Sequence, residues 1–166
     1  MSNILVAYMS ITGNTKIIAQ AIRSGLEGDV SLAAIKEAPG PDSFDLIIIG
    51  FPVHSHSVPV PAERFLKSIP SGKKIALFST HGSLSGSHLS REALEYASIV
   101  AAHCPILGSF SCRGKVSAEA MEEFSRSPQN QVWAEMAVTA RTHPDEHDSA
   151  DARTFARWVQ TLFYQS

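Results

Sequence analysis

The sequence predicts an α/β fold, a three-layer α/β/α sandwich built on a five-stranded parallel sheet. Short segments of continuous apolar residues alternate along the chain with segments in which apolar residues recur at helical spacing. A strand that is apolar throughout is typical of a parallel sheet buried on both faces. Right-handed crossovers between parallel strands then leave few possible topologies.

The strands are the clearest elements. Residues 3–8 (NILVAY) form a short apolar run, and residues 45–50 (DLIIIG) are apolar and β-branched. The other strands are expected at residues 30–35, 73–80 and 106–112. The segment between the second and third strands, residues 36–45, is rich in Pro, Gly and Asp, so a loop is expected there instead of a helix.

Four helices are expected to cover the sheet. One follows Thr15 and ends near Gly25, a second begins at Pro59 or Pro61, and a third spans residues 91–103. The last helix is capped by Asp148 or Ser149. Its buried face is predicted to be Ala152, Phe155, Ala156, Val159, Leu162 and Phe163. Residues 113–147 carry no clear pattern.

Composition narrows the class of protein. A chain of 166 residues with 44% hydrophobic residues is expected to form one domain, and no segment is long and apolar enough for a membrane span. The net charge of −2 and the pI near 6.4 argue against nucleic acid as a partner. Because the chain begins directly with a strand-like pattern and no secretory signal, we expect a cytoplasmic location.

The two cysteines are expected to be free thiols. Cys104 and Cys112 are too few for a disulfide framework and have no metal-ligand partners at close spacing. Cys112 is followed by Arg113-Gly114-Lys115, whose cations would favour a thiolate. We favour instead a buried cysteine at a strand end. Acidic residues crowd the last third of the chain and are interpreted as a solvated surface.

Polar loops follow the first, third and fourth strands, where the ligands of open parallel sheets bind. The first loop contains "SITGNT" and leads into a helix. Unpaired N–H groups and the helix dipole make such a turn an anion site. A single glycine and the absence of a Lys-Ser or Lys-Thr pair exclude the dinucleotide and nucleoside-triphosphate motifs, so one terminal phosphate fits best. Simple helix capping is the alternative.

Ser10-Ile11-Thr12-Gly13-Asn14-Thr15 resembles the phosphate-binding loop of the flavodoxin family. The likeness extends to DLIIIGFPVHSHS and KKIALFSTHGSLSG, and so covers most of the first 110 residues. The resemblance implies the strand order 2-1-3-4-5, non-covalently bound FMN and electron transfer through the flavin. By position, it implies that the phosphate is held by Ser10, Ile11, Thr12, Gly13, Asn14 and Thr15, that the isoalloxazine is flanked by Pro52, Val53, His54 and Ser55, and that its pyrimidine edge meets Thr80, His81, Gly82 and Ser83.

The sequence departs from this family in its aromatic residues. Family members commonly sandwich the flavin ring between a tryptophan and a tyrosine, and the two flavin loops here carry neither. Trp133 and Trp158 lie later in the chain and are predicted to be core residues of helices. The residues left to take over the stacking are His54, His56, His81 and Leu84.

The histidines raise the question of a metal site. His54 and His56 form an H-x-H pair like the start of a zinc hydrolase motif, but the further ligands such a site needs are missing. His143 and His147 are four residues apart, with Pro144 between them, and are interpreted as solvated. We therefore expect no metal and, since flavin chemistry needs no acid or base residue here, no catalytic side chain.

Three functions remain open. The first is an FMN-dependent electron carrier whose partners are a reductase and an acceptor oxidoreductase. The second is an NAD(P)H-dependent flavin or quinone reductase on the same fold, although no second nucleotide motif is found. The third is a binding module that has lost its flavin. Steady-state oxidation of NAD(P)H separates the second from the first, and flavin content separates the third from both.

Overall fold

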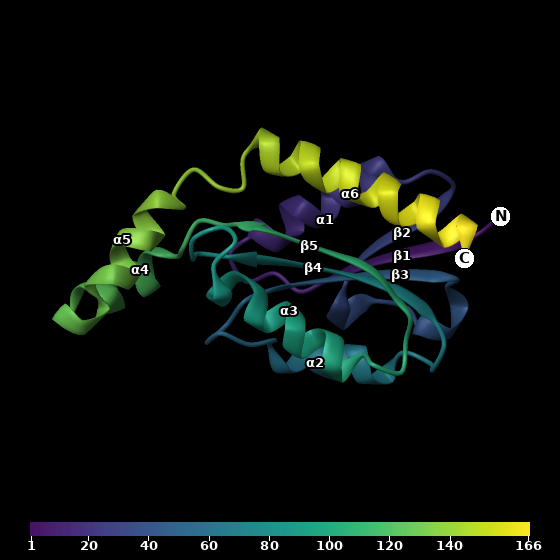
Figure 1. Cartoon of the computed structure of the whole chain (residues 1–166), viewed down its shortest axis with the longest axis horizontal. Helices are drawn as coiled ribbons and strands as arrows, with labels where there is room; N and C mark the ends of the chain where they lie inside the picture. Colours follow the sequence, from purple (N-terminus) through teal and green to yellow (C-terminus); the bar gives the residue numbers. More distant parts are fainter.

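A parallel sheet of five strands forms the centre of the computed structural model, which describes residues 1–166 (Figure 1). The strand order is β2-β1-β3-β4-β5, and every neighbouring pair is parallel. Both the predicted fold class and the predicted order are therefore confirmed. The strands are β1 (Asn3–Tyr8), β2 (Asp29–Ala34), β3 (Leu46–Pro52), β4 (Lys74–His81) and β5 (Ile106–Arg113).

Two helices cover each face of the sheet. Helices α1 and α6 pack together on one face, and α2 and α3 lie on the other (Figure 1). A third pair, α4 and α5, lies beyond the carboxyl ends of the strands (Figure 1). The helices are α1 (Asn14–Gly25), α2 (Val60–Ser68), α3 (His88–Val100), α4 (Ala118–Ser125), α5 (Gln131–Thr139) and α6 (Glu146–Gln165).

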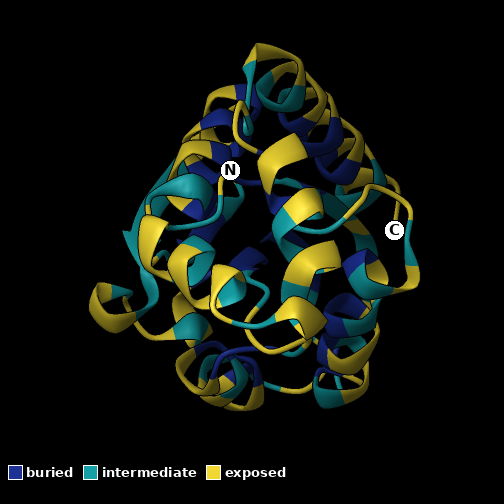
Figure 2. Cartoon of the chain, turned by 90° about the vertical axis from the view of Figure 1, so that its left-hand side faces the viewer, coloured by how far each residue is buried: buried dark blue, intermediate teal, exposed yellow.

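The protein has two hydrophobic core clusters, one on each face of the sheet, because β3 is buried on both faces. Ile47 and Ile49 pack toward α2 and α3, whereas Leu46 and Ile48 pack toward α1 and α6. All four side chains are fully buried, and each contributes about 1.5–3 kcal/mol by leaving water. Exposed residues lie along the outer sides of the helices (Figure 2). Continuous apolar strands therefore produce the covered parallel sheet that they predicted.

The connections differ in part from the predictions. Between β2 and β3 the chain forms two short 3₁₀ turns and no α-helix, as expected. Helix α6 begins at Glu146 and is capped by Asp145, so the predicted cap at Asp148 or Ser149 is wrong. Asp148 instead takes part in a capping box: its N–H donates to Asp145 Oδ1 (3.0 Å), and its Oδ2 accepts from the Asp145 N–H (2.8 Å).

The predicted core positions of both tryptophans are wrong. Trp158 is 50% exposed and lies over Gly108, where a Cβ atom would be 2.4 Å from the indole ring. Trp133 is partly exposed on α5 and lies beside the ring of His56. A helical period alone does not distinguish a residue that faces the sheet from one that overhangs its edge.

The cysteines are buried free thiols, as predicted. Burial raises the pKa of both Cys104 and Cys112, and the carboxylates at the start of α6 raise the pKa of Cys112 further. His143 is not solvated as predicted, since its Nδ1 lies 2.6 Å from Asp148 Oδ2, whereas His147 is exposed. No helix has the length and apolar character that crossing a bilayer requires.

Gly50 sets the packing between β3 and β4. A Cβ atom at this position of β3 would lie 1.9 Å from the ring of the buried Phe78. We expect Gly50→Ala to lower the unfolding free energy by about 1–3 kcal/mol, because the ring must move within a packed core. Urea denaturation checks this. Gly40→Ala is the control, since no atom lies within 4 Å of its Cβ position; an equal effect of both substitutions would contradict the packing argument.

Candidate functional site

Three polar loops meet at the carboxyl edge of the sheet. We call them the first loop (residues 9–13), the second loop (53–59) and the third loop (82–87), which follow β1, β3 and β4. These strands are direct neighbours, so their ends lie side by side. Strand pairing places Pro52 opposite Thr80 at this edge. The crossover topology therefore brings together all three segments that the sequence singled out.

The first loop presents unpaired N–H groups at the start of α1. Gly13 has a φ of +97°, in the left-handed region, and is the N-cap residue of α1. Ser10 Oγ accepts hydrogen bonds from the N–H groups of Gly13 (3.1 Å) and Lys16 (3.3 Å). Four backbone N–H groups donate to no acceptor within the chain: those of Ile11, Thr12, Asn14 and Thr15. Together with the helix dipole, these groups suit a single anionic phosphate.

Two side chains of the predicted phosphate site anchor the start of α1, directly after the first loop. The Thr15 hydroxyl is buried and lies 2.8 Å from the Thr80 hydroxyl, while Asn14 Nδ2 donates to the Lys115 carbonyl (2.8 Å). Both residues keep their backbone N–H groups free. Their partners lie 65 and 101 residues away along the chain, so no local pattern in the sequence indicates them.

The second loop is a tight turn that presents polar side chains to solvent. Its start is fixed by the Val53 N–H, which donates to the Thr80 carbonyl (2.8 Å). His54 and Ser57 then exchange two backbone hydrogen bonds, at 3.0 and 2.9 Å. Ser55 and His56 between them have φ values of 48° and 63°, a left-handed conformation that costs about 1–2 kcal/mol per residue. The side chains of residues 54–56 are exposed.

The third loop is covered by the chain that leaves β5. The His81 carbonyl accepts from the Gly114 N–H (2.8 Å), and a Cβ atom on Gly82 would lie 2.5 Å from Val116 Cγ2. His81 itself is 5% exposed, with its Nδ1 3.0 Å from Ser83 Oγ. Burial lowers the pKa of His81 to about 4, and the charge of Arg113 acts in the same direction. The imidazole is therefore neutral at neutral pH.

Trp133 lies at this site without having been predicted there, and Arg113, at the end of β5, connects its helix to the third loop. The Arg113 guanidinium donates to the carbonyls of Ser83 (2.9 Å), Met136 (2.9 Å) and Thr139 (3.1 Å), and so joins the third loop to α5. The Trp133 ring lies 5.2 Å from the His56 ring, centroid to centroid. Residues 113–147 show no periodic pattern, so the sequence gives no signal that α5 reaches these loops.

Comparison with known proteins agrees with this geometry. The family model described as "Flavodoxin domain" matches residues 5–157. The chain belongs to the flavodoxin family. The flavodoxin-like domain-containing protein BilS of Clostridioides difficile (strain CD3) is 32% identical, and the match covers 92% of this chain and 93% of BilS.

Solved structures share the fold at lower identity. Oxidised flavodoxin 2 from Bacillus cereus is 20% identical, with a TM-score of 0.64 over 96% of this chain and 99% of its own. A flavoprotein from Lactobacillus acidophilus NCFM, solved in complex with FMN, is 19% identical, with a TM-score of 0.55 over 67% of this chain and 93% of its own. These likenesses support the strand order and layers of the flavodoxin fold in this chain.

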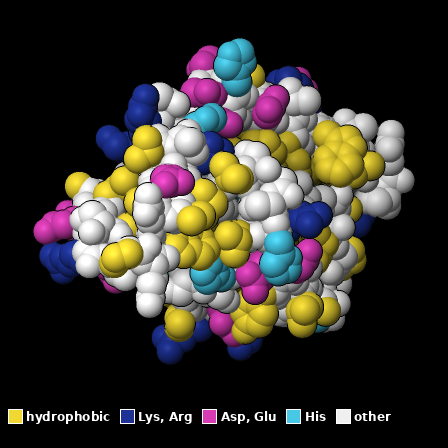
Figure 3. Space-filling model, turned by 60° about the vertical axis from the view of Figure 1, so that its left-hand side comes forward, with side chains coloured by type: hydrophobic (Ala, Val, Ile, Leu, Met, Phe, Trp, Pro, Cys, Tyr) yellow, Lys and Arg dark blue, Asp and Glu magenta, His cyan; other side chains and the backbone are white.

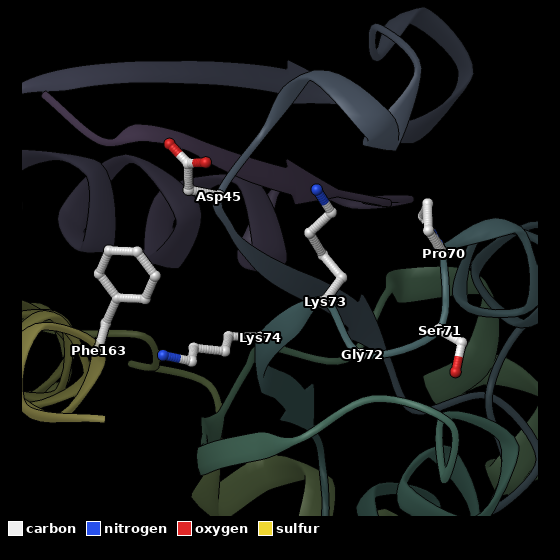
Figure 4. A pocket seen from close by; sticks show the side chains of 7 residues that line it. All are labelled: Asp45, Pro70, Ser71, Gly72, Lys73, Lys74 and Phe163. Carbon is white, nitrogen blue, oxygen red and sulfur yellow. The ribbon is translucent and has the colours of Figure 1, made fainter.

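Apolar side chains and histidines lie together on the face that Figure 3 shows, which is turned toward the carboxyl ends of the strands. A separate hollow lies at the opposite, amino-terminal ends of β3 and β4 (Figure 4). Its two lysines are engaged within the chain: Lys73 Nζ donates to the Asp42 carbonyl (3.3 Å) and Lys74 Nζ to the Ser166 carbonyl (2.7 Å). The site at the carboxyl edge is thus the one that matches the topology of the family.

The buried His81 should make this flavodoxin less stable in mild acid. The unfolded chain binds a proton on this histidine below about pH 6.5, whereas the folded chain does so only near pH 4, so the unfolding free energy falls across this window. We expect the wild type to lose about 2 kcal/mol more than His81→Gln between pH 7 and pH 5. Urea denaturation at both pH values measures this, and equal losses would contradict it.

Proposed function

We propose that the chain binds one FMN non-covalently across the three loops and carries electrons from a reductase to an acceptor oxidoreductase. The strongest support is the row of unpaired N–H groups at the start of α1, where Thr15 bonds to Thr80 in the strand that leads into the third loop. The FMN complex of the Lactobacillus acidophilus flavoprotein adds support, since that protein has the same fold.

The first loop would hold the phosphate of FMN. The N–H groups of Thr12, Asn14 and Thr15 have no acceptor of their own in the chain. Ser10 Oγ already accepts two hydrogen bonds, so its O–H is left to donate to a phosphate oxygen. This arrangement binds an anion by backbone dipoles and hydroxyls, with Gly13 keeping the loop free of a Cβ atom where the phosphate approaches.

The other two loops would hold the isoalloxazine. Pro52, Val53, His54 and Ser55 would flank one side of the ring, and its pyrimidine edge would meet the segment formed by Thr80, His81, Gly82 and Ser83. When bound, FMN accepts and releases electrons singly or in pairs. The neutral His81 adds no formal charge beside that edge, whereas Arg113 places a cation behind Ser83. The protein orients the ring and sets its electrostatic surroundings, and no side chain acts as a catalytic acid or base.

An electron carrier fits this site better than a self-contained reductase. Residues 54–56 are exposed at the tip of the second loop, so a protein partner can approach the ring edge directly. The chain shows no nucleotide motif beyond the first loop. The two free thiols suit a reducing compartment, and we place the carrier in the cytoplasm.

The phosphate contacts should appear as a preference for FMN over riboflavin. We expect Thr12→Glu to weaken FMN binding at least tenfold by placing a carboxylate beside the phosphate, while the affinity for riboflavin stays within about twofold. Gln20→Glu is the matched control, because it adds the same charge further along α1 at an exposed position. Titration calorimetry with both flavins gives the ratio; a parallel loss of both affinities would place the phosphate elsewhere.

Steady-state oxidation of NADH and NADPH distinguishes an electron carrier from a self-contained reductase. We expect the FMN-loaded protein alone to leave NADH and NADPH unoxidised in the steady state, and to pass electrons to cytochrome c only when a flavodoxin reductase is added. Absorbance at the nicotinamide band measures this. Sustained oxidation by the protein alone would instead support an NAD(P)H-dependent flavin or quinone reductase, and a protein that binds no flavin would be a binding module.

A further inference from the structure

The α4–α5 hairpin, residues 118–139, is attached to the protein by very few buried side chains. Helix α4 buries no residue, and α5 buries only Ala137. The two helices contact each other and lie beyond the carboxyl ends of the strands (Figure 1). Burial of apolar surface therefore explains little of why the hairpin lies where it does.

Arg113 supplies the attachment. Its Nε donates to the Ser83 carbonyl, and its two terminal nitrogens donate to the Met136 and Thr139 carbonyls and, at 2.6 Å, to Thr139 Oγ1. No carboxylate lies in salt-bridge distance of this guanidinium. Carbonyls at the carboxyl-terminal end of a helix attract a cation. One planar group thus fixes the end of α5 against the third loop.

This attachment brings Trp133 to the second loop. The Trp133 and His56 rings lie 5.2 Å apart at an interplanar angle of 51°. In the second loop, the strained turn at Ser55 and His56 sets the position of the His56 ring in this contact. Trp133 remains partly exposed, so part of its side chain is not covered by the rest of the protein. The first, second and third loops contain no tryptophan or tyrosine, and Trp133 is a large aromatic side chain that the fold brings to the second loop.

We propose that Trp133 forms an aromatic wall of the isoalloxazine site and that Arg113 positions it there. This rests on the proposed binding of FMN. A flat, largely apolar ring gains from aromatic contact beyond the area it buries. Because the wall comes from a hairpin after β5 and not from a flavin loop, attachment of the hairpin and binding of the flavin stabilise each other.

Fluorescence of bound FMN tests the role of Trp133 directly, because flavin emission is quenched when the ring stacks on an indole. We expect Trp133→Ala to weaken FMN binding about tenfold and to raise the emission of the bound flavin severalfold, with Trp133→Leu giving the same change. Trp133→Phe should retain most of the affinity. Trp158→Ala is the matched control, since Trp158 lies over Gly108 on α6, and it should leave both readouts within about twofold.

Arg113→Met tests the positioning. We expect the emission of bound FMN to rise as in Trp133→Ala, and the double variant to show no further increase, because both changes remove one interaction. Arg141→Met is the control, since Arg141 is exposed beside the end of α5. An Arg113→Met protein with lower stability but fully quenched flavin would show that the arginine is structural only, and would overturn its positioning role.

The outcomes separate this inference from the proposed function. Wild-type protein that binds no FMN would overturn both. Wild-type protein that binds FMN, with Trp133→Ala or Trp133→Leu showing unchanged affinity and unchanged emission, would overturn the wall and leave the FMN site standing. Circular dichroism of each variant establishes that the comparison is made between folded proteins.

Discussion

Thr80 is the residue on which the site depends. At the carboxyl end of β4, its hydroxyl pairs with that of Thr15 (2.8 Å) and its carbonyl accepts from the Val53 N–H (2.8 Å). One residue therefore connects the start of α1, directly after the first loop, with the second loop and with the strand that leads into the third loop. The hydroxyl pair is buried, so an unmatched partner would cost about 1–3 kcal/mol. The arrangement of the loops follows from this joint and from the order of the strands.

The strands and loops that can be predicted from the sequence are those whose residues all lie in the same kind of environment. A strand such as β3 is covered on both faces, so its residues are apolar throughout and its position can be read from the sequence. The loops after β1 and β3 were predicted for the same reason, since each begins where an apolar run stops. Gly13 and Ser10 lie within one turn of each other, and their capping role is local.

The rest of the site depends on partners far away in the sequence. Asn14 bonds to Lys115, Arg113 to Met136 and Thr139, and Trp133 lies against His56. None of these pairs produces a periodic signal, because a hairpin that buries one alanine has no apolar stripe. Local preferences of conformation and charge pairing are also violated at the site. Ser55 and His56 of the second loop adopt a left-handed conformation although neither is a glycine, and Arg113 has no carboxylate partner. Such exceptions are expected at functional sites.

If the three loops form a single FMN site, the chain binds one FMN. The most direct measurement is the visible absorption spectrum of the purified protein, followed by a titration with FMN if it is colourless. Our account predicts a yellow protein, or a colourless one that takes up one FMN per chain and acquires the resolved spectrum of a bound flavin. A chain that remains colourless at saturating FMN would contradict the account, and the unpaired N–H groups of the first loop would then need another anion.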